Sequence, residues 1–246
     1  MILSELIRFQ AGFHWMNTTP FRACIFDLFG TIVPTTLTTA YYDSLRDAAG
    51  RLGLPTDDFV REWHATYLER NRGTLSTLDA NVVEVCRRLK VDAGQEAIAR
   101  SLESFRRMTR EAMTPKPESE EILGTLRERG YPLGLISNCN PEVPDLFRRG
   151  PLARHFDAMF FSAEAGTMKP DPRLYSEMAR LLHVPPRECL YIGDGHEREL
   201  EGASGVGMAT VRVEYDQPGG FVWGRDERAD HHVVDLREIL LILDTQ

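Results

Sequence analysis

Short apolar runs that alternate with helical patterns are the feature that most restricts the fold of this chain. The first run, Ala23–Phe26, has no polar interruption, which is typical of a strand in a parallel sheet that is covered on both faces. Similar short runs recur later, at Leu133–Ile136, Met159–Phe161, Leu190–Ile192, Thr210–Val213 and His232–Val234. Helical patterns separate most of them, at Glu118–Arg129, Glu142–Arg149, Arg173–Leu182 and Arg198–Ser204. This alternation predicts an α/β fold with a doubly wound, Rossmann-like parallel sheet.

Between the first two predicted strands, the sequence changes to helical periodicity with few strand signals. Apolar residues recur at helical spacing, as at Leu45, Ala48 and Leu52 and then at Phe59 and Trp63. Glycines and prolines divide this region into several helices. We therefore expect three parts, which are an N-terminal extension at residues 1–20, an α/β core at residues 21–35 and 117–246, and an all-helical cap at residues 36–116.

The charge balance limits the partners of this protein. The chain has 29 Lys and Arg residues and 37 Asp and Glu residues, which give a formal net charge of −8. We expect no nucleic-acid partner, because binding to nucleic-acid phosphates needs a basic face.

No apolar run reaches the ~18 residues of a membrane helix, and Glu5 and Arg8 interrupt the stretch where a signal peptide would be apolar. The cysteines are dispersed, which indicates reduced thiols and a cytoplasmic location; they are Cys24, Cys86, Cys139 and Cys189.

Reactive polar residues lie at or just after the ends of several predicted strands. Asp27 and Thr31 stand in an Asp-Leu-Phe-Gly-Thr segment, and Ser137 and Asn138 follow the run at Leu133–Ile136. Lys169 stands in Gly-Thr-Met-Lys-Pro-Asp. Asp194 stands in Gly-Asp-Gly-His, and Glu199 lies five positions further on. Open α/β sheets bind ligands at the carboxyl ends of their strands, so we expect these side chains to lie together. A carboxylate on a tight turn suits a nucleophile, and a pair of carboxylates suits Mg²⁺.

Taken together, in this order and spacing, these segments resemble the motifs of the haloacid dehalogenase superfamily. This large group of hydrolases consists mainly of Mg²⁺-dependent phosphatases. The resemblance extends from about Arg22 to Val234, which is nearly the whole chain apart from the N-terminal extension. It implies a doubly wound core, a helical cap inserted after the first motif, and Mg²⁺ as the cofactor.

The resemblance also implies the catalytic roles. Asp27 would attack a phosphoryl group, and Thr31 would orient the first loop through its hydroxyl group. Lys169 would add a fixed positive charge, and the Ser137 hydroxyl would donate to a phosphoryl oxygen. Asn138 would join Ser137 and Lys169 in binding the substrate. From the expected cap, Arg70 and Arg72 are candidates to contact an anionic substrate.

The metal site follows from the same motifs. A carboxylate that attacks a phosphate dianion meets like-charge repulsion, which a divalent cation between Asp27 and Asp194 would screen. By resemblance, the backbone carbonyl of Phe29 completes the protein's share of the ligands. Glu199 stands where the family usually has Asp, as a metal ligand or as an anchor behind the ligands.

Phe29 departs from the family pattern. Most phosphatases of the superfamily have a second Asp there, which acts as a general acid and then as a base. General acid–base help is worth about 10²–10⁴ in rate, so we expect slow hydrolysis of alkyl phosphates unless the cap or His196 supplies a proton. Family dehalogenases also replace this Asp, often by an aromatic residue, but they bind no metal and usually have a small polar residue where Asp194 stands.

These residues favour a Mg²⁺-dependent phosphatase that acts on a small phosphorylated metabolite through an aspartyl-phosphate intermediate. Two alternatives remain open, which are a 2-haloacid dehalogenase-type hydrolase and a catalytically weak member that binds a ligand or a protein. In each case we expect neither nucleic acid nor a membrane as a partner. The sequence says nothing about the oligomeric state.

Overall fold

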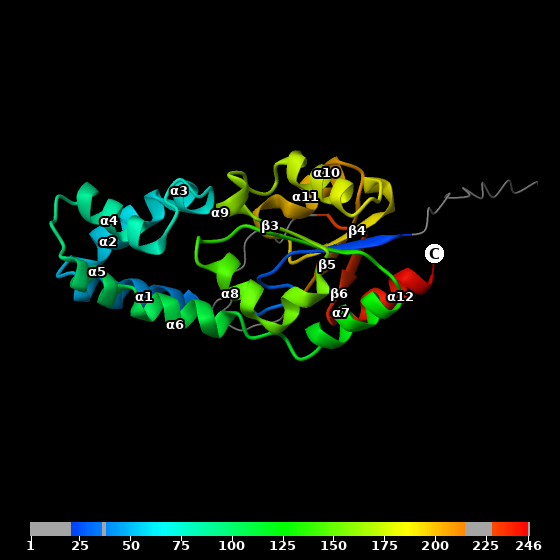
Figure 1. Ribbon diagram of the computed structural model, residues 1–246, viewed down its shortest axis with the longest axis horizontal. Helices are drawn as coiled ribbons and strands as arrows, with labels where there is room; N and C mark the ends of the chain where they lie inside the picture. The colour runs from blue at the N-terminus through cyan, green and yellow to red at the C-terminus, as the bar shows by residue number, and fades with distance from the viewer. Residues whose placement is uncertain (1–20, 36–37, 215–227, 246) are drawn as a thin grey trace, which may run out of the picture.

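Six strands form a single parallel sheet in the computed structural model, which describes residues 21–35, 38–214 and 228–245 (Figure 1). The strands are β1 (Ala23–Phe26), β2 (Leu133–Ser137), β3 (Ala158–Phe161), β4 (Cys189–Gly193), β5 (Ala209–Val213) and β6 (His231–Val233). Their order is β3-β2-β1-β4-β5-β6, and every neighbouring pair is parallel. The chain therefore winds from β1 to one edge of the sheet and from β4 to the other, which makes the β1–β4 boundary the switch point where such sheets bind ligands.

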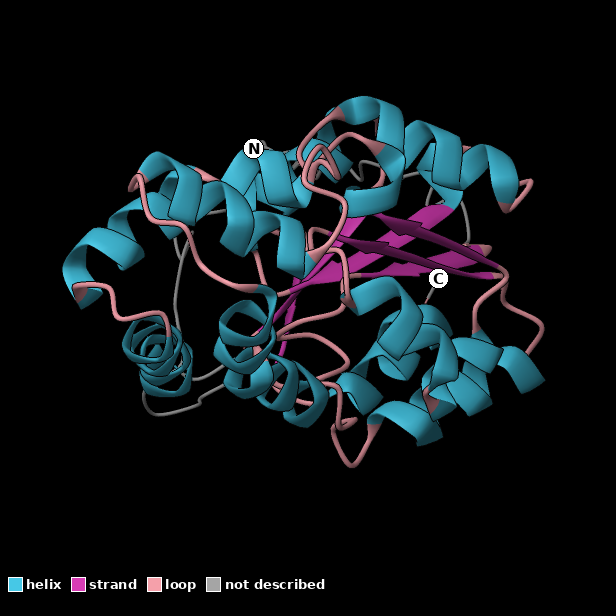
Figure 2. Ribbon diagram, turned by 60° about the vertical axis from the view of Figure 1, so that its left-hand side comes forward, coloured by secondary structure: helices cyan, strands magenta, loops and turns pink. Residues whose placement is uncertain are grey.

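Helices cover both faces of the sheet, so the predicted α/β fold is confirmed (Figure 2). One face packs against α7 (Ser119–Glu128), α8 (Val143–Arg149) and α12 (Ile239–Asp244). The other face packs against α10 (Pro172–Leu181) and α11 (Glu199–Gly205). The remaining short elements are α9 (Ser162–Ala165) and the 3₁₀ helices η1 (Pro151–His155), η2 (Pro186–Glu188), η3 (His196–Arg198) and η4 (Leu236–Glu238).

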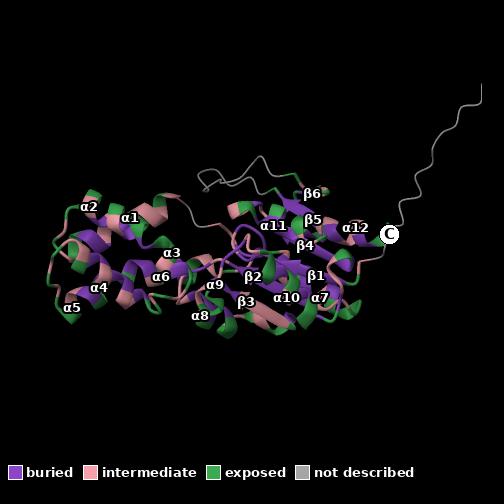
Figure 3. Ribbon diagram, turned by 90° about the horizontal axis from the view of Figure 1, so that it is seen from above, coloured by how far each residue is buried: buried purple, intermediate pink, exposed green. Residues whose placement is uncertain are grey.

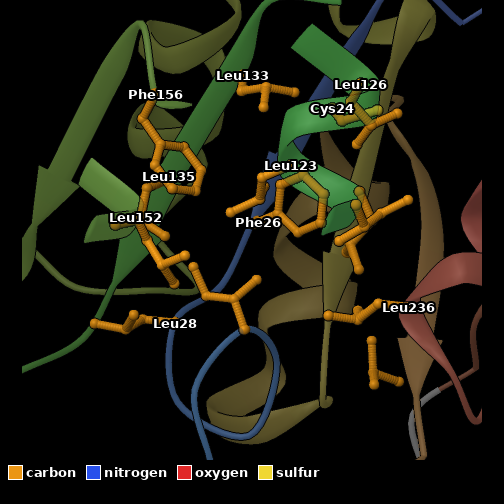
Figure 4. Close-up of a cluster of buried hydrophobic side chains, with 14 of the residues drawn as sticks. Cys24, Phe26, Leu28, Leu123, Leu126, Leu133, Leu135, Leu152, Phe156 and Leu236 are labelled. Atoms are coloured by element: carbon orange, nitrogen blue, oxygen red, sulfur yellow. The ribbon is translucent and has the colours of Figure 1, made fainter. Parts of the chain in front are cut away.

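The central strand shows why its sequence is continuously apolar. Cys24 and Phe26 point into the first core cluster, and Ala23 and Ile25 point into the second. Figure 4 shows the first cluster, in which Phe26 lies close to the α7 side chain of Leu123. Because successive side chains of a strand point to opposite faces, a strand between two helical layers must be apolar at every position.

Six further helices lie between β1 and α7, and all but α3 (Tyr67–Asn71) contribute side chains to a third core cluster. They are α1 (Thr38–Arg51), α2 (Thr56–Ala65), α3 (Tyr67–Asn71), α4 (Leu78–Arg88), α5 (Gln95–Ser101) and α6 (Glu103–Ala112). We call residues 38–112 the helical bundle, and Figure 3 shows it at one end of the molecule, beyond the sheet. The rings of Trp63 and Phe105 stack in its centre at 4.5 Å. The expected boundaries between core and cap stay a prediction, and the expected extension at residues 1–20 lies outside the described residues.

Two expectations from composition can be compared with the described part of the chain. None of its helices combines the length and the apolar character that a membrane crossing requires. All four cysteines are buried and free, in agreement with the expectation of reduced thiols.

Candidate active site

The carboxyl ends of three adjacent strands bring the predicted site residues together. β1 ends just before Asp27, β2 ends at Ser137, and β4 ends just before Asp194. Since β1 lies between β2 and β4 and all three are parallel, these ends share one edge of the sheet. The tertiary structure thus brings together segments that are far apart in the sequence.

Residues 27–33 form a tight turn after β1, which we call the β1 turn. The backbone N–H groups of Ile32 and Val33 both donate to the Leu28 carbonyl, at 3.0 Å. Gly30 has a φ of +78°, and a Cβ atom there would lie 2.1 Å from Asp194 Oδ2. The position therefore requires glycine twice, for its left-handed backbone and for the close approach of the Asp194 carboxylate.

Three carboxylates converge beside the β1 turn. Asp27, Asp194 and Glu199 each offer one oxygen, and these atoms all lie within 4.8 Å of one another. Burial, together with the charge of Glu199, raises the pKa of Asp27 to about 7, although Lys169 opposes the shift. Burial and the charges of Glu199 and Asp27 raise the pKa of Asp194 well above its usual range. Asp27 and Glu199 are buried, and Asp194 is partly buried. We call these three residues the acidic cluster, and such a set of close oxygen donors fits a hard divalent cation.

Lys169 is the cation that contacts the acidic cluster. Its Nζ lies 2.5 Å from Asp27 Oδ1, and it also donates to Glu199 Oε2. Burial opposes the charged form of Lys169, but the neighbouring carboxylates of Asp27 and Glu199 raise its pKa above the ordinary value. The ammonium group therefore stays charged beside the Asp27 carboxylate.

Glu199 is held by the protein at both of its carboxylate oxygens. The Tyr191 hydroxyl donates to Oε2 at 2.8 Å, and the Gly195 N–H donates to Oε1 at 3.0 Å. The side chain is fully buried. These contacts suit the anchoring role that was one of the two expectations for this residue, and its oxygens also belong to the possible metal-ligand set.

The other residues expected at the catalytic centre lie around Asp27. The Thr31 hydroxyl donates to Asp27 Oδ2 at 3.4 Å, and its expected role in orienting the first loop stays a prediction. Phe29 is partly buried, and its side chain packs against the first core cluster. The Ser137 side chain is buried at the end of β2, where its hydroxyl contacts the Asn138 carbonyl at 3.5 Å.

Asn138 binds the main chain of Lys169. Its Oδ1 accepts from the Lys169 N–H at 2.8 Å, and its Nδ2 donates to the Lys169 carbonyl at 3.2 Å and to the Glu197 carboxylate. The amide group is therefore engaged with the protein itself. The expected contact with substrate stays a prediction, and the structure adds a role in positioning Lys169.

The two arginines proposed to reach from the cap differ. Arg70 is 3% exposed and lies on the ring of Trp63 at 4.5 Å. Its Nε donates at 2.9 Å to Asn140, in the loop after β2, so this side chain links the helical bundle to the site's edge of the sheet. Arg72 is exposed, and within the described ranges nothing joins its side chain to the acidic cluster.

Three residues near the site were not predicted from sequence. Tyr191 lies inside an apolar strand, Glu197 lies in the short 3₁₀ helix η3, and Lys116 lies in the loop between α6 and α7. A charged residue is ordinary in the last two segments. Burial and the charges of Glu199 and Asp27 raise the pKa of Glu197 to about 8. Burial lowers the pKa of Lys116 to about 8, against the pull of Glu118, Asp194 and Asp27. No local pattern marks these positions, except that Lys116 stands between two prolines.

Residues 21–207 match the family model of the haloacid dehalogenase-like hydrolases. A glyceraldehyde 3-phosphate phosphatase of Methanopyrus kandleri is 28% identical over 196 residues, which are 78% of this chain and 83% of that protein. A phosphoserine phosphatase of Thermus thermophilus is 36% identical over 129 residues, but the match covers only 51% of this chain and 49% of that protein. The resemblance expected from the motifs is thereby confirmed.

Solved structures show the same fold. A 2-haloacid dehalogenase from Pseudomonas syringae pv. Tomato superposes with a TM-score of 0.68 at 22% identity, over 92% of this chain and 99% of that one. A phosphatase from Thermococcus onnurineus superposes with a TM-score of 0.65 at 22% identity, over 91% and 98%. Because dehalogenases and phosphatases share this fold, the choice between the two reactions depends on the residues of the site.

Proposed function

Because the chain belongs to the haloacid dehalogenase-like hydrolase family, we propose that it is a Mg²⁺-dependent phosphatase acting on a small phosphorylated metabolite. The observation that carries this proposal is the acidic cluster, with Lys169 in contact with Asp27. The phosphatase relatives are named for small phosphorylated molecules, which supports the same substrate class.

The donor set of the site fits Mg²⁺. Asp27 and Asp194 would hold the ion directly, with the Phe29 carbonyl as a third protein ligand and Glu199 as a ligand or an anchor. All of these donors are oxygens, which Mg²⁺ prefers. Burial makes their mutual repulsion costly, as the raised pKa values of Asp27 and Asp194 indicate. When bound, the ion would neutralise charge on the cluster and on the phosphoryl group.

The chain's own residues would carry out two displacements at phosphorus. An Asp27 carboxylate oxygen forms a bond to phosphorus while the bond to the leaving oxygen breaks, and the leaving group takes up a proton from solvent water, since Phe29 supplies none. A water molecule then attacks the aspartyl-phosphate, which releases orthophosphate and regenerates Asp27. Lys169 and the Ser137 hydroxyl would stabilise the negative charge of the transferring group in both steps.

We propose that residues 36–116 act as a cap over a core formed by residues 21–35 and 117–246. The contact between Arg70 of α3 and Asn140 of the loop after β2 supports this role, because it joins the two parts beside the site. A lid in this position would exclude water and select the substrate.

The activity can be tested with p-nitrophenyl phosphate, whose leaving group needs little help from an acid. We expect the full chain to release phosphate with Mg²⁺ and to stop when EDTA is added. Asp27→Asn and Asp194→Asn should each lower kcat by at least about 10³-fold, because each removes a charge that the reaction requires. Asp92→Asn, at an exposed position in the helical bundle, is the matched control and should keep full activity.

The same preparation tests the dehalogenase alternative. Halide release from a 2-haloacid without any metal, abolished by Asp27→Asn but retained in Asp194→Asn, would replace the phosphatase proposal. Failure to release either product from a folded chain would leave a binding role.

A further inference from the structure

Lys116 is a buried, positively charged residue to which the proposed reaction assigns no role. It lies between α6 and α7, where the chain returns from the helical bundle to the sheet. The side chain is only 2% exposed. Lysine is among the residues least often buried, since removing its ammonium group from water costs free energy unless polar partners replace the water. Its position therefore needs an explanation.

Two hydrogen bonds join Lys116 to the β1 turn. Its Nζ donates to the Gly30 carbonyl at 2.7 Å, and its backbone N–H donates to the Ile32 carbonyl at 3.2 Å. The hydroxyl of Ser119 donates to the same Ile32 carbonyl at 2.6 Å. The return segment is thus tied to the turn that follows Asp27, and the bond from the ammonium group is the charge-assisted one.

Gly30 connects Lys116 to the acidic cluster. The Asp194 carboxylate lies against the α-carbon of Gly30, where a Cβ would be 2.1 Å from Oδ2. The Lys116 ammonium binds the carbonyl of that same residue. Lys116 and Asp194 therefore approach one residue of the β1 turn. The charges that attract Lys116 are those of Glu118 first and then of Asp194 and Asp27.

The charge balance of the site indicates that a second positively charged residue would favour the binding of a phosphate anion. The acidic cluster carries three carboxylates, and Lys169 contacts two of them. With a dication and one lysine the cluster would be neutral, and a further positive charge nearby would favour an incoming phosphate anion.

We propose that Lys116 is a second cationic residue of the phosphate site, and that its charge, held at the Gly30 carbonyl, weakens the binding of a cation and strengthens the binding of an anion. This inference rests on the proposed function, because it assumes that the site binds Mg²⁺ and phosphate. The bond of its ammonium group is to the Gly30 carbonyl, so Lys116 would act on the bound ions through its charge, as a positioning residue and not as a catalytic one.

The test is calorimetric titration of the full chain, first with Mg²⁺ and then with orthophosphate in the presence of saturating Mg²⁺. Lys116→Met removes the charge at similar side-chain length. We expect Mg²⁺ to bind about tenfold more tightly, because a repulsive charge is gone, and orthophosphate about tenfold more weakly, because an attractive one is gone. Lys116→Arg keeps the charge and should restore both affinities to near the wild-type values.

Lys90→Met is the matched control. Lys90 is exposed and follows α4 in the helical bundle, so the same substitution there should change neither affinity. Thermal unfolding of each variant establishes that it is folded before titration.

The outcomes separate this inference from the function on which it rests. Opposite changes in the two affinities support it, since structural damage would weaken both. If the wild-type chain binds both ions and Lys116→Met weakens both, or changes neither, the inference about Lys116 is wrong and the proposed function stands. If the wild-type chain binds neither ion, the proposed function fails and this inference fails with it.

Discussion

At the residue scale, Phe29 could serve the site through its main chain but not through its side chain. Its main chain belongs to the turn beside Asp27, whereas its side chain packs against the first core cluster. A phenylalanine therefore leaves a backbone carbonyl for a metal ion but supplies no proton to a leaving group.

Phe29→Asp should raise the turnover of alkyl phosphates by roughly 10²-fold, because it adds an acid next to the nucleophile. The measurement is kcat for an alkyl phosphate relative to p-nitrophenyl phosphate, whose good leaving group should gain much less. Asn is nearly the same size as Asp but has no acidic proton, so Phe29→Asn serves as the control. Equal rates for the two variants would show that the missing acid does not limit the reaction.

Glu197 provides a prediction about pH. Its pKa in the folded protein, about 8, lies above its ordinary value, so between those two values the folded chain binds more protons than the unfolded chain. The free energy of unfolding contributed by this group is therefore fully present at low pH and is lost as the pH rises through about 8.

We expect the Tm of the metal-free chain to fall between about pH 5 and about pH 8, and Glu197→Gln to fall less steeply. Glu128→Gln, at an exposed position at the end of α7, is the control and should keep the wild-type slope. An unchanged slope in Glu197→Gln would contradict the assignment of this proton to Glu197.

At the scale of elements, α3 and α9 form a contact between the helical bundle and the sheet domain, and Figure 1 shows them side by side. Gly73, which follows α3, has a φ of +71°, and a Cβ atom there would lie 1.9 Å from the Ala163 carbonyl oxygen in α9. Arg70 reaches Asn140 from the same helix. The position of the helical bundle against the sheet therefore depends on the close approach of the backbones at Gly73 and at Ala163.

Gly73→Ala should both destabilise the chain and lower kcat/KM, because the methyl group prevents this approach. Gly53→Ala is a matched control, since Gly53 also has a positive φ, +68°, but open space around its Cβ position. The control should lose only the ~1–2 kcal/mol of a left-handed alanine and keep its kcat/KM. Urea unfolding and steady-state kinetics measure the two effects, and similar kcat/KM values would mean that the contact does not serve catalysis.

At the scale of the whole molecule, a metal site between strands couples ligand binding to global stability. Asp27 follows β1, whereas Asp194 follows β4, so an ion bound by both would join the two halves of the sheet at the switch point. Such an ion would bind the folded chain and not the unfolded one, and would therefore stabilise the fold.

Mg²⁺ should therefore raise the Tm, by an amount equivalent to about 2.7 kcal/mol when its free concentration is about 100 times its Kd. Asp194→Asn should abolish this increase, and Asp92→Asn should retain it. A scanning measurement at constant ionic strength distinguishes specific binding from a general salt effect. No increase in the wild-type chain would count against a resident Mg²⁺ site.

Much of the fold was predictable from local patterns. The run at Ala23–Phe26 matches β1 residue for residue, and the helix expected at Arg173–Leu182 differs from α10 by one position at each end. The site was predictable in part, since Asp27, Lys169 and Asp194 lie as close together as their motifs implied. These predictions succeeded because apolar periodicity and turn chemistry act between residues that are near in the chain.

By itself, the sequence determined which segments become strands, which become helices and which carboxylates end the strands. Only the tertiary structure decided that Lys116 reaches Gly30, that Tyr191 and Lys169 both bind Glu199, and that Arg70, rather than Arg72, meets the loop after β2. Contacts of this kind join residues that are far apart in the chain or buried in an apolar strand, so no local pattern records them. They arise from the packing of whole elements, which brings a buried polar group to the partner that replaces its water.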